Sequence, residues 1–293
     1  MTTTPTDATR PEVARPEPAR PSTPVRERVL GFLGRHFATV VGSLAILYLL
    51  VPVGVIVALS LNKPAGRYNY SWNEFSTYNW THMCGPYGLC DSVVLSLKIA
   101  ALAALAATVI GVLAAYALTR FRFRARGAVN LLVLMPMAMP EVVLGASLLT
   151  LFVNLRMSLG FSTVLLAHIM FCISFVVVTV KARLAMLDPR LDEAAMDLYA
   201  TPWRAFRKVT LPLAAPGIAA GAVLAFALSF DDFIITNFNS GNSVTFPMYV
   251  WGAARRGVPA QVNVVATLMF LIVLTLALTV SIVAARRSRR DAA

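Results

Sequence analysis

The stretch KIAALAALAATVIGVLAAYAL, residues 98–118, begins with a lysine and continues almost entirely with apolar or small side chains. An α-helix needs about 20 such residues to cross the hydrocarbon core of a bilayer. Its many alanines favour close approach between helices, because in lipid the helices are held by packing rather than by a hydrophobic force. The stretch therefore predicts a membrane-spanning helix inside a bundle.

The composition of the whole chain agrees with this interpretation. Of its 293 residues, 58% are hydrophobic and 14% are charged. A soluble domain usually carries about 25% charged residues. Three cysteines are too few for a disulfide scaffold or an iron–sulfur site. The excess of apolar residues is typical of a protein embedded in a lipid bilayer.

Hydropathy predicts an all-α membrane protein with six transmembrane helices. The predicted spans cover residues 37–61, 92–119, 128–153, 163–183, 214–236 and 263–285. The third span contains Pro136 and Pro140. Proline removes a helical hydrogen bond and clashes with the preceding turn, so we expect this helix to be kinked.

The two ends of the chain differ in composition from the part between them. Residues 1–35 hold six prolines among Thr, Ala, Arg and Glu, and they offer little apolar surface to bury. We expect a disordered tail there, because nothing offsets the entropy lost on ordering. The predicted transmembrane domain covers residues 36–287, and residues 288–293 form a basic C-terminus.

The positive charge is distributed unevenly over the two sides of the predicted membrane protein. The formal net charge is +12, which in a soluble protein would indicate nucleic-acid binding. If the six spans alternate, 20 of the 26 Lys and Arg residues lie on one side, in the tail, residues 120–126, residues 181–208 and residues 286–290. The positive-inside rule then places both termini in the cytoplasm. Topology accounts for the charge, so we expect a lipid bilayer and no nucleic acid as partner.

The cytoplasmic segment between spans four and five reads DPRLDEAAMDLYATPWRAFRKVTLPLAAPG, residues 188–217. It predicts two short helices. The first has its start signal at Asp188 and Asp192, and the second at Thr201-Pro202, with the hydroxyl as N-cap and proline in the first turn. We expect the second helix to end at Leu211-Pro212, because the residue before proline disfavours the α conformation.

This segment resembles the EAA loop of ATP-binding-cassette (ABC) importer permeases, and we call it the EAA loop. The family pattern is E-A-A, three residues, G, nine residues, I, one residue and L-P. The matching positions, which the resemblance makes the ATPase-docking residues, are Glu193, Ala194, Ala195, Tyr199, Val209, Leu211 and Pro212. One departure is important. Tyr199 stands where the family has glycine, so the geometry of the turn between the two short helices is open.

The resemblance implies that a short helix of this loop inserts into a groove of a separate ATPase. No Gly-Lys-Ser or Gly-Lys-Thr occurs in the sequence, and the chain therefore has no Walker A motif to bind phosphates. We expect the chain to be a transport subunit without a cofactor or enzymatic activity of its own, with ATP and Mg²⁺ bound by the partner. The scattered histidines His36, His82 and His168 give no metal-binding pattern, and His168 is read as a packed, hydrogen-bonded residue.

Among importer permeases, the chain is most similar to the second permease of spermidine/putrescine-type systems. The stretches that carry this likeness are PMAMPEVVLGASLLTLF at residues 136–152, the EAA loop, and AFALSFDDFIITNFNSG at residues 225–241. The likeness implies three partners: a dimer of ATPases, a second homologous permease and an extracytoplasmic substrate-binding protein.

Acidic and aromatic residues give a separate argument about the substrate. Glu141 lies in predicted span three, and Asp231 and Asp232 lie near the outer end of span five. Carboxylates at such depth are costly, so they are paired, protonated or exposed to a polar path. A path for a cation with several amines would use them, with Tyr249 and Trp251 adding cation–π contacts. The alternatives are a carboxyl bonded to freed backbone at Glu141 and a polar interface or outer gate at the aspartates.

Two external loops, residues 62–91 and 237–262, complete the prediction. The first is rich in Tyr and Trp, which indicates either an aromatic belt at the lipid interface or a surface for a soluble partner. Cys84 and Cys90 fall in the same loop, separated by turn-forming residues in an oxidising compartment. A disulfide and two free thiols are both open.

Three functions fit these patterns. The first is an importer permease subunit in the cytoplasmic membrane that passes a polyamine-like cation by alternating access. The second is the same architecture for another solute, such as an amino-acid derivative, a phosphonate or an anion. The third is a secondary transporter or a membrane enzyme that works without ATP, which the spacing of the EAA loop disfavours.

Overall fold

The computed structural model describes residues 25–66 and 68–291, and the chain divides into two units, residues 1–55 and 56–293. The described part of the first unit is a single helix, α1 (Val25–Ser60), which continues a few residues into the second unit. Its apolar part, Thr39–Ser60, is long enough to cross a membrane and lies within the first predicted span, residues 37–61.

The start of α1 corrects one prediction. The helix begins at Val25, so the predicted disordered tail extended eleven residues too far. Residues 25–35 contain Arg, Glu, Val and Leu without a proline, and these are adequate helix formers once an apolar helix continues after them. The remainder of the predicted tail, residues 1–24, lies outside the described residues.

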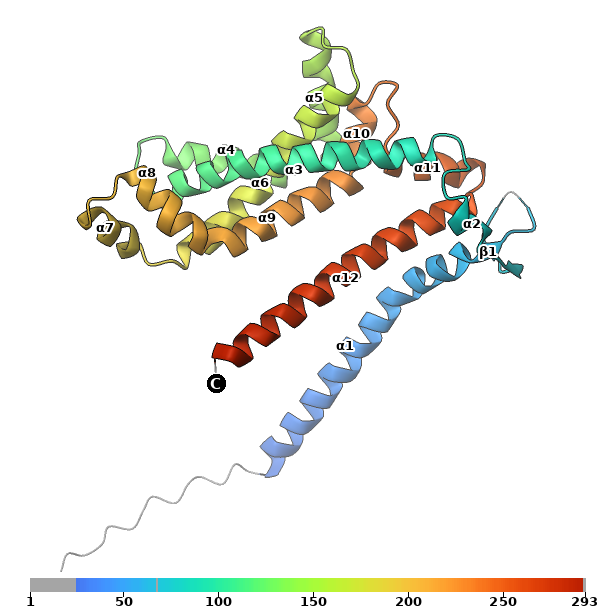
Figure 1. Ribbon diagram of the computed structural model, residues 1–293, viewed down its shortest axis with the longest axis horizontal. Coiled ribbons are helices and arrows are strands. Elements are labelled where there is room, and N and C mark those ends of the chain that lie inside the picture. The colour runs from blue at the N-terminus through green and yellow to red at the C-terminus, as the bar shows by residue number, and fades with distance from the viewer. Residues whose placement is uncertain (1–24, 67, 292–293) are drawn as a thin grey trace, which may run out of the picture. The chain divides into compact units, whose positions relative to one another are not determined.

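The second unit is built around three long helices: α3 (Leu89–Arg120), α6 (Phe161–Ala185) and α9 (Leu211–Asp231). They run alongside one another in Figure 1 and pack through small residues. Ala103 and Ala107 are fully buried, and a Cβ added at Gly111 of α3 would lie 2.7 Å from Cγ1 of Val176 in α6. The close packing expected of the alanine-rich stretch is therefore present.

The third predicted span is two helices rather than one kinked helix. α4 (Arg126–Ala138) and α5 (Glu141–Asn154) meet at an angle of 109°. Pro140 occupies the break, where it has no N–H to donate and its ring disfavours a continuous helix. α5 packs instead on α10 (Ile234–Asn239), where the side chain of Asn239 donates to the Gly145 carbonyl at 3.3 Å.

The fifth predicted span also ends earlier than expected. α9 stops at Asp231, Asp232 takes an extended conformation, and α10 starts as a separate helix at Ile234. The last long helix, α12 (Ala260–Asp291), contains the sixth predicted span. Among the described residues, four helices are long and apolar enough to cross a membrane, or five if the bent pair α4–α5 is one span. The chain is therefore a multi-pass helical membrane protein.

The first of the two loops predicted to be external, residues 62–91, has its own small structure. β1 (Asn62–Lys63) pairs antiparallel with β2 (Glu74–Phe75), and a short helix, α2 (Tyr78–Thr81), follows. Buried asparagines hold this loop together: the Asn62 amide donates to Asn69 Oδ1 at 2.6 Å, and the Asn79 amide donates to the Asn62 carbonyl at 2.8 Å. The second loop predicted to be external, residues 237–262, carries α11 (Phe246–Arg256).

Candidate functional site

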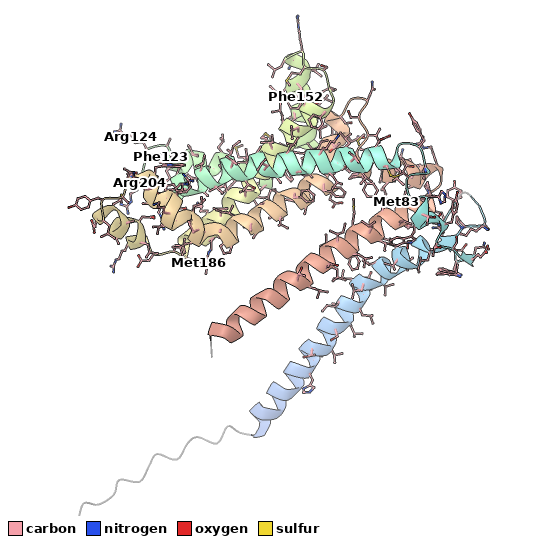
Figure 2. All side chains as sticks on the ribbon, viewed as in Figure 1. Met83, Phe123, Arg124, Phe152, Met186 and Arg204 are labelled. Carbon is pink, nitrogen blue, oxygen red and sulfur yellow. A yellow bond between two sulfur atoms is a disulfide. The ribbon has the colours of Figure 1, made fainter. Side chains whose placement is uncertain are left out.

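The two short helices expected in the EAA loop are present. α7 (Arg190–Asp197) begins after Pro189, and Asp188 Oδ1 accepts a hydrogen bond of 2.9 Å from the Arg190 N–H. α8 (Pro202–Ala205) has Thr201 as N-cap, with Thr201 Oγ1 accepting from the Arg204 N–H at 3.3 Å. The starts of both helices were therefore predicted correctly, with Asp188 and Thr201 as the capping side chains. In Figure 2, Arg204 lies at the same end of the second unit as Phe123 and Arg124, just beyond α3.

The predicted end of the second short helix is wrong. α8 continues through a π-helical turn, η1 (Phe206–Thr210), into α9, so that Pro202–Asp231 forms one helix of 30 residues. The Leu211 N–H bonds to the Phe206 carbonyl, five residues back. The wider turn moves carbonyls away from their α-helical positions, which makes room for the ring of Pro212 and explains why this proline does not end the helix.

Tyr199 keeps the turn that glycine would make. Its φ is +61°, in the left-handed region that glycine adopts readily and other residues rarely adopt. The bonds that close the turn run from the Tyr199 N–H to the Met196 carbonyl at 2.9 Å and from the Ala200 N–H to the Ala195 carbonyl at 3.1 Å. The phenol ring is 96% exposed. The departure from the family pattern therefore changes the surface of the loop and strains its backbone, while the turn is retained.

The outer surface of the EAA loop is apolar and accessible. Leu198 is 83% exposed and Trp203 is 62% exposed. Beside them lies a groove of about 290 Å³ whose lining includes Ala195, Tyr199 and Val209, three positions of the family pattern. Glu193 is also exposed. A large exposed apolar patch of this kind is typical of a protein–protein interface.

The inner side of the same loop is bonded to the helix bundle. The Oδ2 atom of Asp192 lies 3.0 Å from Nε of Arg120, at the end of α3, and Thr210 Oγ1 donates a hydrogen bond to Asp192 Oδ1. The sequence predicts Asp192 as part of a helix start signal and Arg120 as one of the basic residues that set the membrane topology. The two residues are far apart in the chain, and no local pattern links them.

The acidic residues singled out in the sequence meet at a second site. A cavity of about 920 Å³, which we call the acidic cavity, is lined by Glu141, Asp231 and Asp232. Phe171, Phe230, Phe233, Phe246 and Trp251 form aromatic walls. Among the described residues that line it, none is Lys or Arg. Four of the five predicted substrate-path residues are therefore brought together. Tyr249 is not among the lining residues and packs instead against the apolar cluster that contains Leu89.

The two neighbouring aspartates have different environments. Asp232 accepts from the Thr236 N–H at 2.7 Å and from Thr236 Oγ1 at 2.8 Å, and its Oδ2 lies 3.2 Å from Nε2 of His168. Its carboxylate therefore caps the start of α10. Asp231 is exposed, and its carboxylate makes no hydrogen bond or ion pair within the described part of the chain. The same is true of Glu141.

His168 of α6 completes a buried polar network. Its Nδ1 lies 2.7 Å from Ser229 Oγ and its Nε2 lies 2.9 Å from Thr236 Oγ1, while the residue is only 2% exposed. This confirms the interpretation of His168 as a packed, hydrogen-bonded histidine. The network joins α6, the end of α9 and α10, so it holds the helix break that borders the acidic cavity.

One aromatic wall of the cavity already contacts a cation. The guanidinium carbon of Arg255 lies 5.1 Å from the centre of the Trp251 ring, and that ring packs at 5.2 Å from Phe233. Trp251 therefore has the exposure and orientation that cation–π contact requires.

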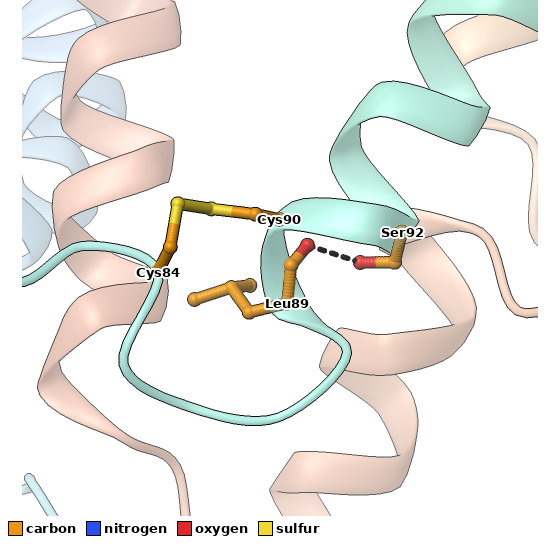
Figure 3. Close-up of a disulfide and its surroundings, with 4 residues drawn as sticks. All are labelled: Cys84, Leu89, Cys90 and Ser92. Atoms are coloured by element: carbon orange, nitrogen blue, oxygen red, sulfur yellow. Dashed lines mark hydrogen bonds between the residues drawn. A yellow bond between two sulfur atoms is a disulfide. The ribbon is translucent and has the colours of Figure 1, made fainter.

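At the other end of α3, the structure joins Cys84 and Cys90 in a disulfide, with the two Cα atoms 5.3 Å apart (Figure 3). Gly88 between them has φ +78°, a conformation that glycine adopts without strain. Leu89 beside the disulfide is fully buried, and Ser92 Oγ donates to its carbonyl at 2.7 Å (Figure 3). The disulfide thus fixes the loop at the start of α3.

The long apolar helices, the exposed EAA loop and the acidic cavity together define a membrane-embedded transport subunit. The family model of the inner membrane component of binding-protein-dependent transport systems matches residues 107–290. The chain belongs to this family. It is a transport subunit and not an enzyme, as the resemblance of the EAA loop implied.

Relatives with known functions narrow the family further. The spermidine/putrescine transport system permease protein PotC of Haemophilus influenzae is 41% identical over 80% of this chain and 90% of its own length. The putrescine transport system permease protein PotI of Escherichia coli is 40% identical over 76% of this chain and 81% of its own length. The predicted similarity to the second permease of such systems is confirmed.

Solved structures confirm the fold. A bacterial ABC transporter that imports the acidic polysaccharide alginate matches with a TM-score of 0.64 and 16% identity, over 89% of this chain and 99% of the other. The MetNI methionine ABC transporter in an inward-facing conformation matches with a TM-score of 0.54 and 20% identity, over 66% and 92%. At these identities the likeness concerns the fold alone.

Proposed function

We propose that this chain forms half of the translocation path of an ATP-driven importer for polyamines such as spermidine and putrescine. The observation that carries the proposal is the acidic cavity, whose lining in the described part of the chain has three carboxylates, aromatic walls and no Lys or Arg. A polyamine carries its charges on amines joined by short apolar chains. Carboxylates suit the amines and aromatic faces suit both the amines and the linkers.

Two of the three carboxylates are available to a substrate. Asp231 and Glu141 are exposed and unpaired within the described residues, whereas Asp232 is bonded to His168 and Thr236. We therefore assign substrate contact to Glu141, Asp231 and Trp251, and a supporting role to Asp232. The names of the relatives, which are spermidine/putrescine and putrescine permeases, support the same cargo.

The energy would enter through the EAA loop. The exposed surface around Glu193, Leu198 and Tyr199, with the groove beside it, fits a docked ATPase that binds ATP and Mg²⁺. In this proposal a dimer of ATPases, a second homologous permease and an extracytoplasmic binding protein complete the importer. ATP binding would draw the EAA loops together and open the path outward, and hydrolysis would reset it, through differential affinity for the two states.

The proposal includes the topology. Six spans with both termini in the cytoplasm place the EAA loop on the side where ATP is available, and they place the Cys84–Cys90 disulfide on the oxidising side. The sixth span would be supplied by α12, and the third by the bent pair α4–α5.

The test is uptake of radiolabelled putrescine and spermidine by proteoliposomes that contain the complete importer. We expect uptake that requires ATP and falls about tenfold in Glu141→Gln and in Asp231→Asn, since the loss of one charged contact to the substrate removes roughly 1.4 kcal/mol or more. Glu74→Gln is the matched control, because Glu74 lies in the external hairpin and pairs with Lys63. Unchanged uptake in both cavity variants, or ATP-driven uptake of amino acids or anions only, would contradict the polyamine proposal.

A further inference from the structure

The ion pair between Arg120 and Asp192 is placed unlike its neighbours. Both side chains are 11% exposed, whereas Arg122 and Arg124, a few residues further on, are exposed. An arginine that serves only to set topology needs no burial, because it acts through its charge near the membrane surface. Burial of a charged pair costs desolvation energy, so a pair of this kind indicates a specific role.

The Asp192 carboxylate joins three elements that are separate in the chain. One oxygen pairs with Arg120 of α3, and the other accepts from Thr210 in the π-helical turn, while the residue itself belongs to α7. Next to this joint, the ring centres of Tyr116 in α3 and Phe206 in η1 are 4.5 Å apart. Polar and aromatic contacts therefore fix the inner side of the EAA loop to the end of α3.

α3 also has fixed contacts at its other end. Ser96 Oγ accepts from the Phe246 N–H of α11 at 2.8 Å, and Leu89 packs in one buried cluster with Phe246. A helix of 32 residues spans about 48 Å at 1.5 Å per residue. A straight helix held at both ends links the EAA loop to the external loop structure.

We propose that Arg120 and Asp192 are positioning residues that tie α7 to α3, so that displacement of the EAA loop moves α3 together with α6 and α9. The proposal rests on the docking of an ATPase at this loop. Chain connectivity alone would carry such a displacement only into α6 and α9, which flank the loop. The ion pair adds a direct link to a third helix, α3, whose far end contacts α11 through Ser96 and Phe246.

The first test asks whether the Arg120–Asp192 ion pair holds α7 to α3, which we call the tie, and it needs neither substrate nor partner. The full-length chain in membranes is treated with chymotrypsin, and cleavage after Tyr199 and Leu198, which are 96% and 83% exposed, is followed by mass spectrometry. We expect Arg120→Gln and Asp192→Asn to be cleaved about tenfold faster, since breaking a buried pair raises the population of the opened loop. The double variant Arg120→Asp with Asp192→Arg should return to within about twofold of the wild-type rate.

Matched controls lie on the same two elements. Asp197 of α7 and Arg122 after α3 are exposed and make no ion pair within the described residues, so Asp197→Asn and Arg122→Gln should be cleaved at the wild-type rate. Equal cleavage of the wild type and both single variants would overturn the proposal. Cleavage of the two control variants as fast as that of the two test variants would also overturn it.

The second test asks whether the tie transmits motion. In the reconstituted importer, the amount of solute carried per ATP hydrolysed should fall about tenfold in each single variant and recover in the charge-swapped variant, with the ATPase still bound. An unchanged ratio in Arg120→Gln and Asp192→Asn would overturn the proposal. A wild-type importer that carries another solute would contradict only the proposed cargo, because the chymotrypsin test and the ratio for that solute still decide the tie.

Discussion

Two pairs of adjacent acids, Asp192–Glu193 in the EAA loop and Asp231–Asp232 beside the acidic cavity, are divided in the same way. In each pair one carboxylate is buried and bonded to residues distant in the chain, and the other is exposed without a partner among the described residues. In the EAA loop the buried acid is the first of its pair, Asp192, and at the cavity it is the second of its pair, Asp232. Adjacent residues of the same type therefore have different roles, and sequence order does not decide which.

The helix geometry explains this division. Successive residues of an α-helix point about 100° apart, so one of two neighbours faces the bundle when the other faces away. At Asp192 the bundle supplies Arg120 and Thr210. At Asp232 the helix itself ends, which frees the carboxylate to cap α10 and to meet His168. In both places the buried acid holds backbone in position and the exposed acid is left for a ligand or partner.

The largest effect that tests this comparison concerns stability at the cavity. Asp232→Ala should lower the free energy of unfolding by about 3 kcal/mol, because it leaves His168 and two N–H groups of α10 without their acceptor. Asp231→Ala should change it by less than about 0.5 kcal/mol, as is usual for an exposed residue without partners. Thermal melting of the purified chain in detergent measures both. Equal melting temperatures for the two variants would show that the aspartates are not divided as described.

The next effect concerns the exposed acid of the EAA loop. Glu193→Lys should leave the melting temperature unchanged, since Glu193 has no partner in the described chain, but it should uncouple transport from hydrolysis by about tenfold through loss of a charged contact to the ATPase. The measurement is solute carried per ATP in the reconstituted importer. Asp197→Lys, on the same helix but outside the EAA pattern, is the control. Normal coupling in Glu193→Lys would argue against docking through this residue.

The smallest effect concerns the strained turn. Tyr199→Gly should be more stable than Tyr199→Ala by about 1 kcal/mol, because glycine adopts a φ of +61° without the steric cost that alanine retains. Both variants remove the phenol ring, so their difference isolates the backbone. Thermal melting of the two variants is the measurement. If alanine and glycine give the same stability, the left-handed conformation at this position carries no strain.

Features that depend on local chemistry could be predicted from the sequence. Runs of about 20 apolar residues predicted the long helices, and Thr201-Pro202 predicted the start of α8, because hydropathy and capping depend only on nearby sequence. The acids at positions 141, 231 and 232 were assigned to one path because carboxylates in apolar segments are costly, and the structure places all three around one cavity.

Irregular helix geometry and contacts with distant partners could not be predicted. Pro212 was expected to end a helix, but a π-helical turn accommodates it. Pro140 was expected to kink a span, and the structure shows a bend of 109°, which is stabilised by packing of α5 on α10. The roles of Asp192 and Asp232 required their partners Arg120 and His168, which lie far away in the sequence.

The π-helical turn at Phe206–Thr210 has a consequence for how the EAA loop can move. A turn of this kind holds one residue more than a regular α-helical turn. If this turn tightened into a regular α-helix while α9 kept its place in the bundle, α8 would shift along its axis by about 1.5 Å, the rise of one residue, and rotate by about 100°. The π-helical turn therefore allows α8 to move relative to α9, whereas a regular helix would have to move as a whole.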